Sequence, residues 1–245
     1  MNKKLFPRFF VVIHVQHKTN DNEASKHVIE EATKIFKAGA SGIFLIPDYE
    51  NESNGHSKRA TSEDLFFYYS EIKKLFPNFP VGVNFLKRFE TMESDLIDAI
   101  KEKDFNMIQS DGSFAKIIPL VAEVSRTDFF TGLAFKYSRH SSASGDDLKR
   151  LCDNIPKFNY VIPTTSGIAT GKPADYEKIK EIKTYLSIDQ RLGIASGITE
   201  ENVKTFLEIG VTDFLVATSL IEKNVKGFDI LSSEKIKVLA EKILT

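Results

Sequence analysis

Short apolar runs alternate with amphipathic stretches along the whole chain. The apolar runs are mostly continuous rather than alternating, which is typical of parallel strands covered on both faces. They predict eight strands, at residues 9–15, 42–48, 81–86, 105–111, 129–136, 159–164, 191–196 and 213–220.

The stretches between these runs carry apolar residues at helical spacing. In residues 22–39, NEASKHVIEEATKIFKAG, the side chains of Ala24, Val28 and Ala32 fall on one stripe. Residues 173–186 begin with Pro173, whose missing N–H is not needed in the first turn of a helix. Further helices are predicted at residues 61–76, 90–103, 113–125, 146–152, 199–209 and 232–244.

Eight strands alternating with eight helices predict an α/β fold, a (β/α)8 TIM barrel that spans residues 1–245 as a single domain. The competing fold is a doubly wound open sheet, which usually has fewer strands and a glycine-rich turn after the first strand. Residues 11–23, VVIHVQHKTNDNE, have no glycine at that position. The barrel is therefore the expected fold.

A sizeable core can form, because 42% of the residues are hydrophobic and 27% are charged. The 33 basic and 34 acidic residues give a net charge of -1. We therefore expect neither nucleic acid nor an anionic membrane surface as a partner. The single cysteine, Cys152, excludes an internal disulfide and fits a reducing compartment.

The first residues superficially resemble a secretion signal, because Lys3 and Lys4 precede the stretch LFPRFFVVIHV. Pro7 and Arg8 interrupt that stretch, and no small-residue cleavage site follows it. We interpret it as the first buried strand. No segment approaches the ~20 apolar residues of a membrane span, so we expect a cytoplasmic protein without membrane insertion.

Two small, hydroxyl-bearing turns occur in residues 191–221, RLGIASGITEENVKTFLEIGVTDFLVATSLI. Ser196 and Gly197 follow one predicted strand, and Thr218 and Ser219 end the next. In this type of barrel a phosphate often lies between the loops after strands seven and eight. A glycine lets its amide approach an anion without a Cβ in the way. These four residues are therefore predicted to bind a phosphate group.

A simpler interpretation of the same segment is that Thr199 caps the following helix, with Asn202 in a capping-box position. The cap and a phosphate site are compatible. Glu200 and Glu201 in the first helical turn argue against a phosphate, because they would repel a dianion nearby.

The loop after the sixth predicted strand lies within residues 161–183, VIPTTSGIATGKPADYEKIKEIK, and is rich in glycine and hydroxyl groups. Loops at this end of a barrel are where function concentrates. The alternative is a solvated surface loop, since Gly, Ser and Thr are common loop formers. Together with the end of the third strand, this loop supplies the candidate substrate-binding residues Asn84, Thr165, Gly167, Thr170, Gly171 and Lys172.

Polar side chains at the ends of the predicted strands are the catalytic candidates. They are His14, Asp48, Asn84, Gln109, Asp111 and Lys136, of which we select Lys136, Asp111, Asp48 and His14. An ammonium group that closes a buried strand is costly without a partner. Lys136 could pair with Asp111, bind a phosphate, form a Schiff base, or belong to a structural ion pair at the rim.

The other candidates also have two interpretations each. Asp48 and Asp111 could act as acid and base or hold a divalent cation, or they could be solvated at the rim. His14 could be a general base or a hydrogen-bonded core residue. No metal-ligand spacing such as His-Glu-x-x-His occurs, so no metal site is predicted, and the sequence names no cofactor.

Four motifs belong to these regions: VGVNFL, GLAFKYS, TTSGIATGKPADYEKIKEIK and GIASGITEENV. They resemble the motifs of the BtpA-type barrels, which are named for a photosystem I biogenesis protein and belong to the ribulose-phosphate-binding barrels. The matching positions are His14, Asn84, Lys136, Thr170, Gly171, Ser196, Gly197 and Asn202. The resemblance implies a phosphoribosyltransferase-like activity on a phosphorylated small-molecule ligand.

The chain departs from that family on the expected active face. Its second strand ends in IPDYE where the family tends to have Glu-Asn, and Tyr137 stands where a histidine is usual. Three functions therefore stay open: an enzyme acting on a sugar phosphate or phosphoribosyl compound, a catalytically degenerate barrel that serves as an assembly or biogenesis factor, and a Schiff-base aldolase that uses Lys136. A homo-oligomer is expected from the habit of the fold alone.

Overall fold

The computed structural model describes residues 5–18, 22–48, 60–86, 101–102, 105–112 and 127–245. Within these residues eight parallel strands close into a barrel, in which each strand pairs with the next and β8 pairs with β1. The strands are β1 (Arg8–Val15), β2 (Gly42–Pro47), β3 (Val81–Asn84), β4 (Met107–Ser110), β5 (Asp128–Gly132), β6 (Val161–Ser166), β7 (Gly193–Ala195) and β8 (Asp213–Val216). The predicted (β/α)8 barrel is confirmed.

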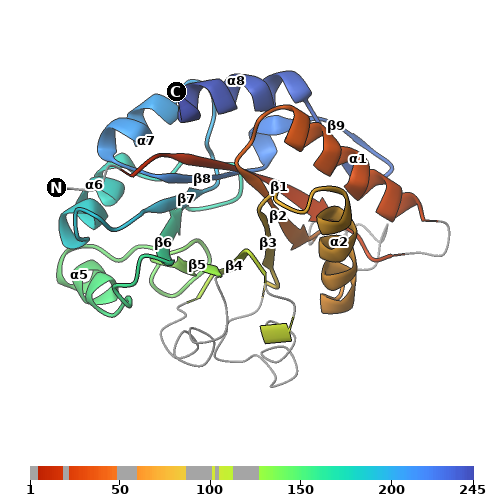
Figure 1. Ribbon diagram of the computed structural model, residues 1–245. Coiled ribbons are helices and arrows are strands. Elements are labelled where there is room, and N and C mark those ends of the chain that lie inside the picture. Colours follow the sequence, from red (N-terminus) through yellow and green to blue (C-terminus); the bar gives the residue numbers. More distant parts are fainter. Residues whose placement is uncertain (1–4, 19–21, 49–59, 87–100, 103–104, 113–126) are drawn as a thin grey trace.

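Helices follow the strands and form an outer layer around them (Figure 1). In the described part of the chain they are α1 (Glu23–Lys37), α2 (Ser62–Leu75), α5 (Gly145–Asp153), α6 (Tyr176–Tyr185), α7 (Val203–Ile209) and α8 (Ser233–Leu244). The helices predicted at 90–103 and 113–125 lie outside the described residues, apart from helical residues 101 and 102. None of the described helices combines the length and apolar character needed to cross a bilayer.

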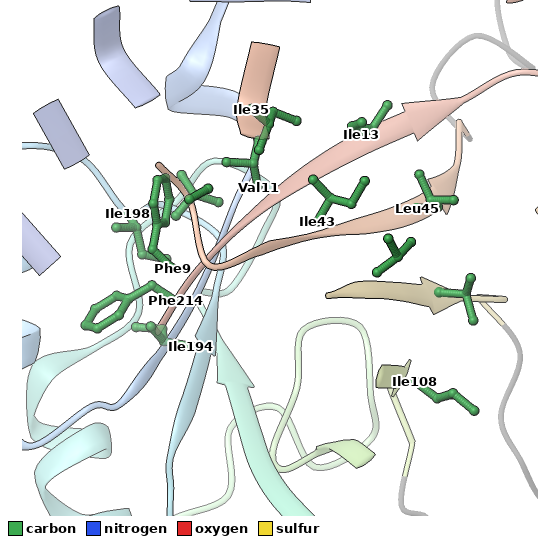
Figure 2. Close-up of a cluster of buried hydrophobic side chains, with 14 of the residues drawn as sticks. Phe9, Val11, Ile13, Ile35, Ile43, Leu45, Ile108, Ile194, Ile198 and Phe214 are labelled. Carbon is green, nitrogen blue, oxygen red and sulfur yellow. The ribbon is translucent and has the colours of Figure 1, made fainter. Parts of the chain in front are cut away.

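The hydrophobic core has two parts, because successive side chains of a strand point to opposite faces of the sheet. Along β1, Phe9 and Val11 point outward into the larger core between the strands and the helices. Figure 2 shows Val11 beside Ile35 of α1 in this layer. Phe10 and Val12 alternate with them and belong to the smaller core inside the barrel.

Three phenylalanine rings fill the middle of the barrel. Phe10, Phe44 and Phe130 pack edge to face, with ring centroids 5.0 to 5.7 Å apart. A Cβ at Gly82 would lie 2.4 Å from the ring of Phe44, so β3 needs a glycine there to make room for the ring. These rings fill the middle of the described barrel, and a cavity opens beyond them, at the carboxyl ends of the strands.

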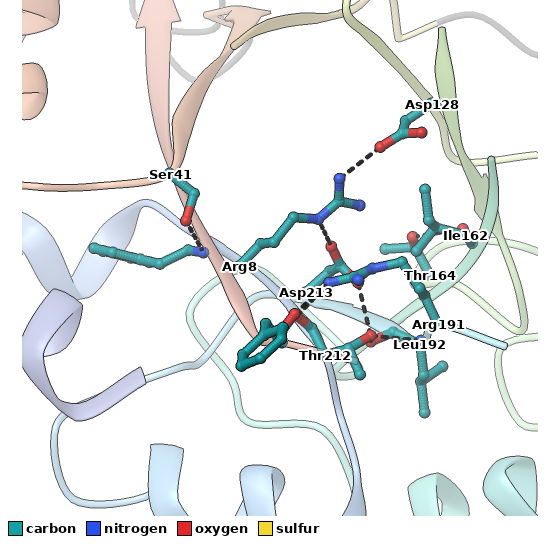
Figure 3. A network of polar contacts seen from close by, with 11 residues as sticks. Arg8, Ser41, Asp128, Ile162, Thr164, Arg191, Leu192, Thr212 and Asp213 are labelled. Carbon is teal, nitrogen blue, oxygen red and sulfur yellow. Dashed lines mark hydrogen bonds and ion pairs between the residues drawn. The ribbon is translucent and has the colours of Figure 1, made fainter. Parts of the chain in front are cut away.

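An ion-pair network closes the opposite end of the barrel (Figure 3). Arg8 donates to Asp128 and to Asp213, each at 2.6 Å, and Arg191 donates to the second oxygen of Asp213 at 2.7 Å. Thr212 also donates to Asp213 at 2.7 Å. The Asp213 carboxylate is fully buried, and three side chains satisfy its oxygens.

Two strands, β5 and β8, end four residues earlier than the hydrophobic pattern predicts. β5 ends at Gly132 rather than at residue 136, because the chain turns at Ala134 and Tyr137, whose φ angles are 45° and 60°. β8 ends at Val216, and Thr218–Leu220 form a short 3-10 helix instead of a continued strand. The apolar residues Leu133 and Phe135 lie in the loop after Gly132 but pack into the two hydrophobic cores, which explains why the apolar pattern continues beyond the strand.

A hairpin that the sequence did not predict follows β8. Its strands are β9 (Ile221–Val225) and β10 (Phe228–Leu231), and they pair antiparallel. The turn residues Lys226 and Gly227 have φ angles of 52° and 86°, as a two-residue hairpin turn of this kind requires. Gln16 donates to the Gly227 carbonyl at 2.5 Å, which fastens the hairpin to the carboxyl end of β1.

Candidate functional site

A cavity of about 420 Å3 opens at the carboxyl ends of the strands. Its size lies within the ~300–1,000 Å3 that ligand sites usually have. The predicted site residues that line it are His14, Asn84, Asp111, Lys136, Thr170, Gly171, Ser196, Gly197, Thr218 and Ser219. The topology therefore brings together residues that the sequence places more than 200 positions apart.

Four predicted site residues do not line the cavity: Asp48, Thr165, Gly167 and Lys172. Asp48 is buried after β2, where its amide donates to the Val15 carbonyl at 2.9 Å. Thr165 is buried within β6, because that strand runs to Ser166 and does not end at residue 164 as predicted.

Gly167 and Lys172 meet through their backbones rather than through a ligand. A Cβ at Gly167 would lie 2.0 Å from the carbonyl oxygen of Lys172, so the loop after β6 requires a glycine at this point. The Lys172 side chain is exposed.

Lys136 links three loops at the mouth of the cavity. Its Nζ donates to Thr170 Oγ1 at 3.0 Å and to Ser196 Oγ at 3.2 Å. Its backbone amide donates to Ser166 Oγ at 2.8 Å, which places the start of its side chain. The sequence placed Lys136 at the end of a strand, but the residue lies in the loop after β5, four positions beyond Gly132. Lys136 therefore presents its ammonium group where the loops after β5, β6 and β7 meet.

The turns after β7 and β8 lie side by side, as the sequence predicted. Ser219 Oγ donates to the carbonyl of Ile198 at 2.6 Å, which joins the two turns directly. Ser196 and Gly197 both have positive φ angles, 79° and 65°. Thr218 faces Gly171 across the cavity wall, since a Cβ at Gly171 would lie 3.6 Å from Thr218 Cγ2.

The packing of the loop after β6 requires a glycine at position 197. A Cβ there would lie 2.2 Å from the backbone nitrogen of Pro173 and 2.4 Å from the Lys172 carbonyl oxygen. Gly197 therefore makes room for the loop after β6, and the approach of its amide to an anion stays a prediction. A side chain at this position would push that loop away from the cavity wall.

The cap predicted for the next helix is wrong in position, although the expected contact between Asn202 and Thr199 is present. α7 begins at Val203, with Asn202 and not Thr199 at its N-cap position. Asn202 Oδ1 accepts from the Thr199 amide at 2.9 Å, and its Nδ2 donates to the Gly197 carbonyl at 2.7 Å. The side chain of Asn202 thus fixes the shape of the turn after β7, because it bonds to both ends of that turn.

Asp111 and Asn84 form a polar pair on the wall made by β3 and β4. Asn84 Nδ2 donates to Asp111 Oδ1 at 3.5 Å, and Asn84 Oδ1 accepts from the Leu86 amide at 2.8 Å. Burial raises the pKa of Asp111 above its ordinary value, although the Asn84 hydrogen bond and the charge of Lys136 act in the opposite direction. A carboxyl group with a raised pKa inside a cavity is suited to give and take protons.

Asp111→Asn is expected to stabilise the protein at about pH 7 and to have little effect at about pH 3. Because the folded-state pKa is raised, the contribution of Asp111 to stability is complete below its unfolded pKa. That contribution is lost as the pH rises through the folded pKa. Melting temperatures of both proteins across this pH range measure the effect. A variant that melts below the wild type at neutral pH would contradict it.

His14 has a partner that the sequence did not reveal. His14 Nδ1 lies 3.0 Å from Asp229 Oδ2, and Asn224 Nδ2 donates to the other oxygen of Asp229 at 2.9 Å. Burial alone would raise the pKa of Asp229, but the hydrogen bonds from His14 and Asn224 outweigh it and hold the pKa below its ordinary value. A carboxylate on Nδ1 favours the tautomer that carries its proton there, which leaves Nε2 as the basic nitrogen.

Comparison with known proteins identifies the fold but not a family. No family model matches the chain, and neither does any curated protein. Among solved structures, phosphoribosyl anthranilate isomerase from Thermus thermophilus matches with a TM-score of 0.62 and 14% identity, covering 96% of this chain and 97% of that one. The chain shares the fold of these barrels.

Two further solved structures have the same fold as this chain. Thiamine phosphate pyrophosphorylase from Pyrococcus furiosus matches with a TM-score of 0.56 and 10% identity, covering 97% of both chains. The native KDPGal structure matches with a TM-score of 0.60 and 10% identity, covering 99% of this chain and 98% of that one. At such identities the likeness concerns the fold alone.

The described residues of the barrel support neither a metal centre nor a cysteine nucleophile. Among them, no group of three or more His, Cys, Asp and Glu side chains is placed to hold a metal ion. Cys152 lies on α5 in the core, and burial raises the pKa of its thiol to about 12. A thiol with so high a pKa is a poor nucleophile at neutral pH.

Proposed function

We propose that this barrel is an enzyme that acts on a phosphorylated small molecule, a sugar phosphate or a phosphoribosyl compound. The phosphate would lie beside the turns after β7 and β8. The observation that carries the proposal is the position of Lys136, whose Nζ contacts Thr170 and Ser196 at the mouth of the cavity. A cation, several hydroxyl groups and small residues are combined at the place where barrels of this type commonly hold a phosphate.

The two glutamates that argued against a phosphate do not line the cavity. Glu200 accepts from Lys242 Nζ of α8 at 2.8 Å, and both glutamate side chains are exposed on the outside of the barrel. Their repulsion of a bound anion is therefore screened by solvent and, for Glu200, offset by a lysine.

Asp111 and His14 supply acid and base chemistry in this proposal. Both line the same cavity as Lys136, and Asp229 orients His14 through its Nδ1. One carboxyl group with a raised pKa and one imidazole would serve a proton transfer on a substrate that the phosphate site holds in place. The names of two structural neighbours, an isomerase of a phosphoribosyl compound and a thiamine phosphate pyrophosphorylase, fit this class of substrate.

The finer assignments are expectations from the sequence and from the habit of the fold. A BtpA-type, phosphoribosyltransferase-like activity, a cytoplasmic location and a homo-oligomer stay predictions. Use of Lys136 as a Schiff-base nucleophile also stays a prediction. Attack on a carbonyl requires the neutral amine.

A thermal-shift screen with sugar phosphates, phosphoribosyl compounds and nucleotides tests the proposal. A ligand at 100 times its Kd is expected to stabilise the protein by ~2.7 kcal/mol. Thr218→Val, which removes one hydroxyl group from the cavity wall, should reduce the shift. Thr184→Val on the exposed face of α6 is the matched control and should leave it unchanged. If no phosphorylated compound raises the melting temperature of the wild type, the proposal is wrong.

A further inference from the structure

The inner end of the cavity is apolar, in contrast to its mouth. Its floor and walls include Val12, Ile46, Phe135, Ala195 and Leu215, which belong to the core inside the barrel. These side chains offer no hydrogen bond to a ligand. A polyhydroxylated chain that reached them would lose its hydrogen bonds to water without replacing them, which is unfavourable. The described floor therefore suits hydrocarbon or an aromatic ring.

One buried side chain in this cavity has an unsatisfied polar atom. Gln109 on β4 is 3% exposed and lines the cavity. Among the described residues, its Oε1 has no hydrogen-bond partner. A buried carbonyl oxygen without a donor destabilises a fold, so its presence beside a ligand cavity needs an explanation. Because Oε1 is itself buried, a ligand's N–H or O–H group would supply the missing donor once the Gln109 amide turns toward the cavity that the residue lines.

We propose that the ligand is a phosphate ester with an apolar, ring-sized body, which presents an N–H or O–H group to Gln109. This inference rests on the proposed function and narrows its substrate class. The phosphate occupies the mouth at Lys136, the ring lies on the apolar floor, and the donor group reaches the wall of β4. A bare sugar phosphate satisfies the first of these regions but not the second.

A panel of small phosphates separates the contributions of the three regions. It consists of inorganic phosphate, ribose 5-phosphate, phenyl phosphate and the three ring-aminated phenyl phosphates, with binding measured by calorimetry. Phenyl phosphate is expected to bind more tightly than ribose 5-phosphate. At least one aminated phenyl phosphate is expected to bind about tenfold more tightly than phenyl phosphate, because it gives Gln109 a hydrogen bond.

Gln109→Met tests the residue itself, because methionine has a similar shape and no amide. The variant is expected to melt at or above the wild-type temperature, since the lost Oε1 makes no hydrogen bond in the described structure. It should also lose the preference for the aminated ring. Gln190→Met is the matched control: Gln190 is also buried with an unpartnered amide atom, its Nε2, but it does not line the cavity. That variant should keep the preference.

The outcomes distinguish this inference from the proposed function. If none of the phosphates binds the wild type, the proposed function itself fails. If ribose 5-phosphate binds as tightly as the phenyl phosphates, the phosphate site stands and the apolar body is wrong. If Gln109→Met melts well below the wild type, or keeps the preference for an aminated ring, the role given to Gln109 is wrong.

Discussion

Asp213→Ala is expected to lower the free energy of unfolding by about 3–5 kcal/mol, the usual effect of removing one partner from a buried ion pair. Asp213 is fully buried and accepts hydrogen bonds from Arg8, Arg191 and Thr212. Its removal leaves two guanidinium groups at the closed end of the barrel without their shared counter-ion. Urea denaturation with a two-state analysis measures the change.

Asp128→Ala is the matched control for this prediction. Asp128 pairs with the same arginine, at 2.6 Å, but its side chain is 26% exposed. Water can replace part of the lost interaction there, so we expect a loss of about 1 kcal/mol, as for pairs near the surface. Equal losses for the two variants would show that burial of Asp213 does not determine the stability of the network.

Lys136→Met is expected to weaken the binding of any phosphorylated ligand by about 100-fold. Hydrogen bonds to charged groups contribute ~1.5–3 kcal/mol each, and the ammonium group lies where the loops after β5, β6 and β7 meet. Methionine keeps most of the apolar stem of the side chain. Calorimetry at low and at high salt measures the effect, and the wild-type affinity should fall with salt more steeply than that of the variant.

Lys172→Met controls for the loss of a positive charge near the cavity mouth. Lys172 is exposed and does not line the cavity, so its variant should bind the same ligand with nearly unchanged affinity. Unchanged affinity in Lys136→Met would contradict the phosphate site. A borohydride-reduced adduct on Lys136 with a carbonyl-bearing sugar phosphate would show Schiff-base chemistry in its place.

The barrel itself could be predicted from the sequence because its signal is strong and repeated. Each strand is buried on both faces, so its residues form a continuous apolar run, and each helix has one apolar stripe. The ends of the strands could not be read in the same way. Leu133 and Phe135 continue the apolar run of β5, yet they are buried in a loop. Hydrophobicity records burial and does not distinguish a strand from a buried loop.

The hairpin β9–β10 was not predicted because its strands are regular but mostly not buried. Most of its side chains are exposed or half-buried, so no apolar run marks it. Its one local signal is the pair Lys226-Gly227, which suits a tight two-residue turn but lacks the usual Asn or Asp before the glycine. Asp229, the partner of His14, lies in this hairpin and was therefore missed as well. A contact between residues so far apart in the chain depends on the closed barrel and has no local pattern.

The candidate site was predictable in outline and not in detail. The small residues after β7 and β8 lie side by side on one cavity, because the fold dictates where the carboxyl ends of the strands meet. The role of each glycine depends on what packs against it. Gly167 and Gly197 both lie against the backbone at residues 172 and 173, which no property of the glycines themselves could indicate.

Because Cys152 is buried, the rate at which its thiol is alkylated reports how often the packing around α5 opens. The Cys152 side chain on α5 is buried in the hydrophobic core, and the raised pKa of its thiol keeps the proton bound at neutral pH. An alkylating reagent can therefore modify Cys152 only while the packing around it is open. The sequence has one cysteine, so the added mass of a single alkyl group identifies each molecule that has opened. The measurement uses the native sequence and needs no introduced label.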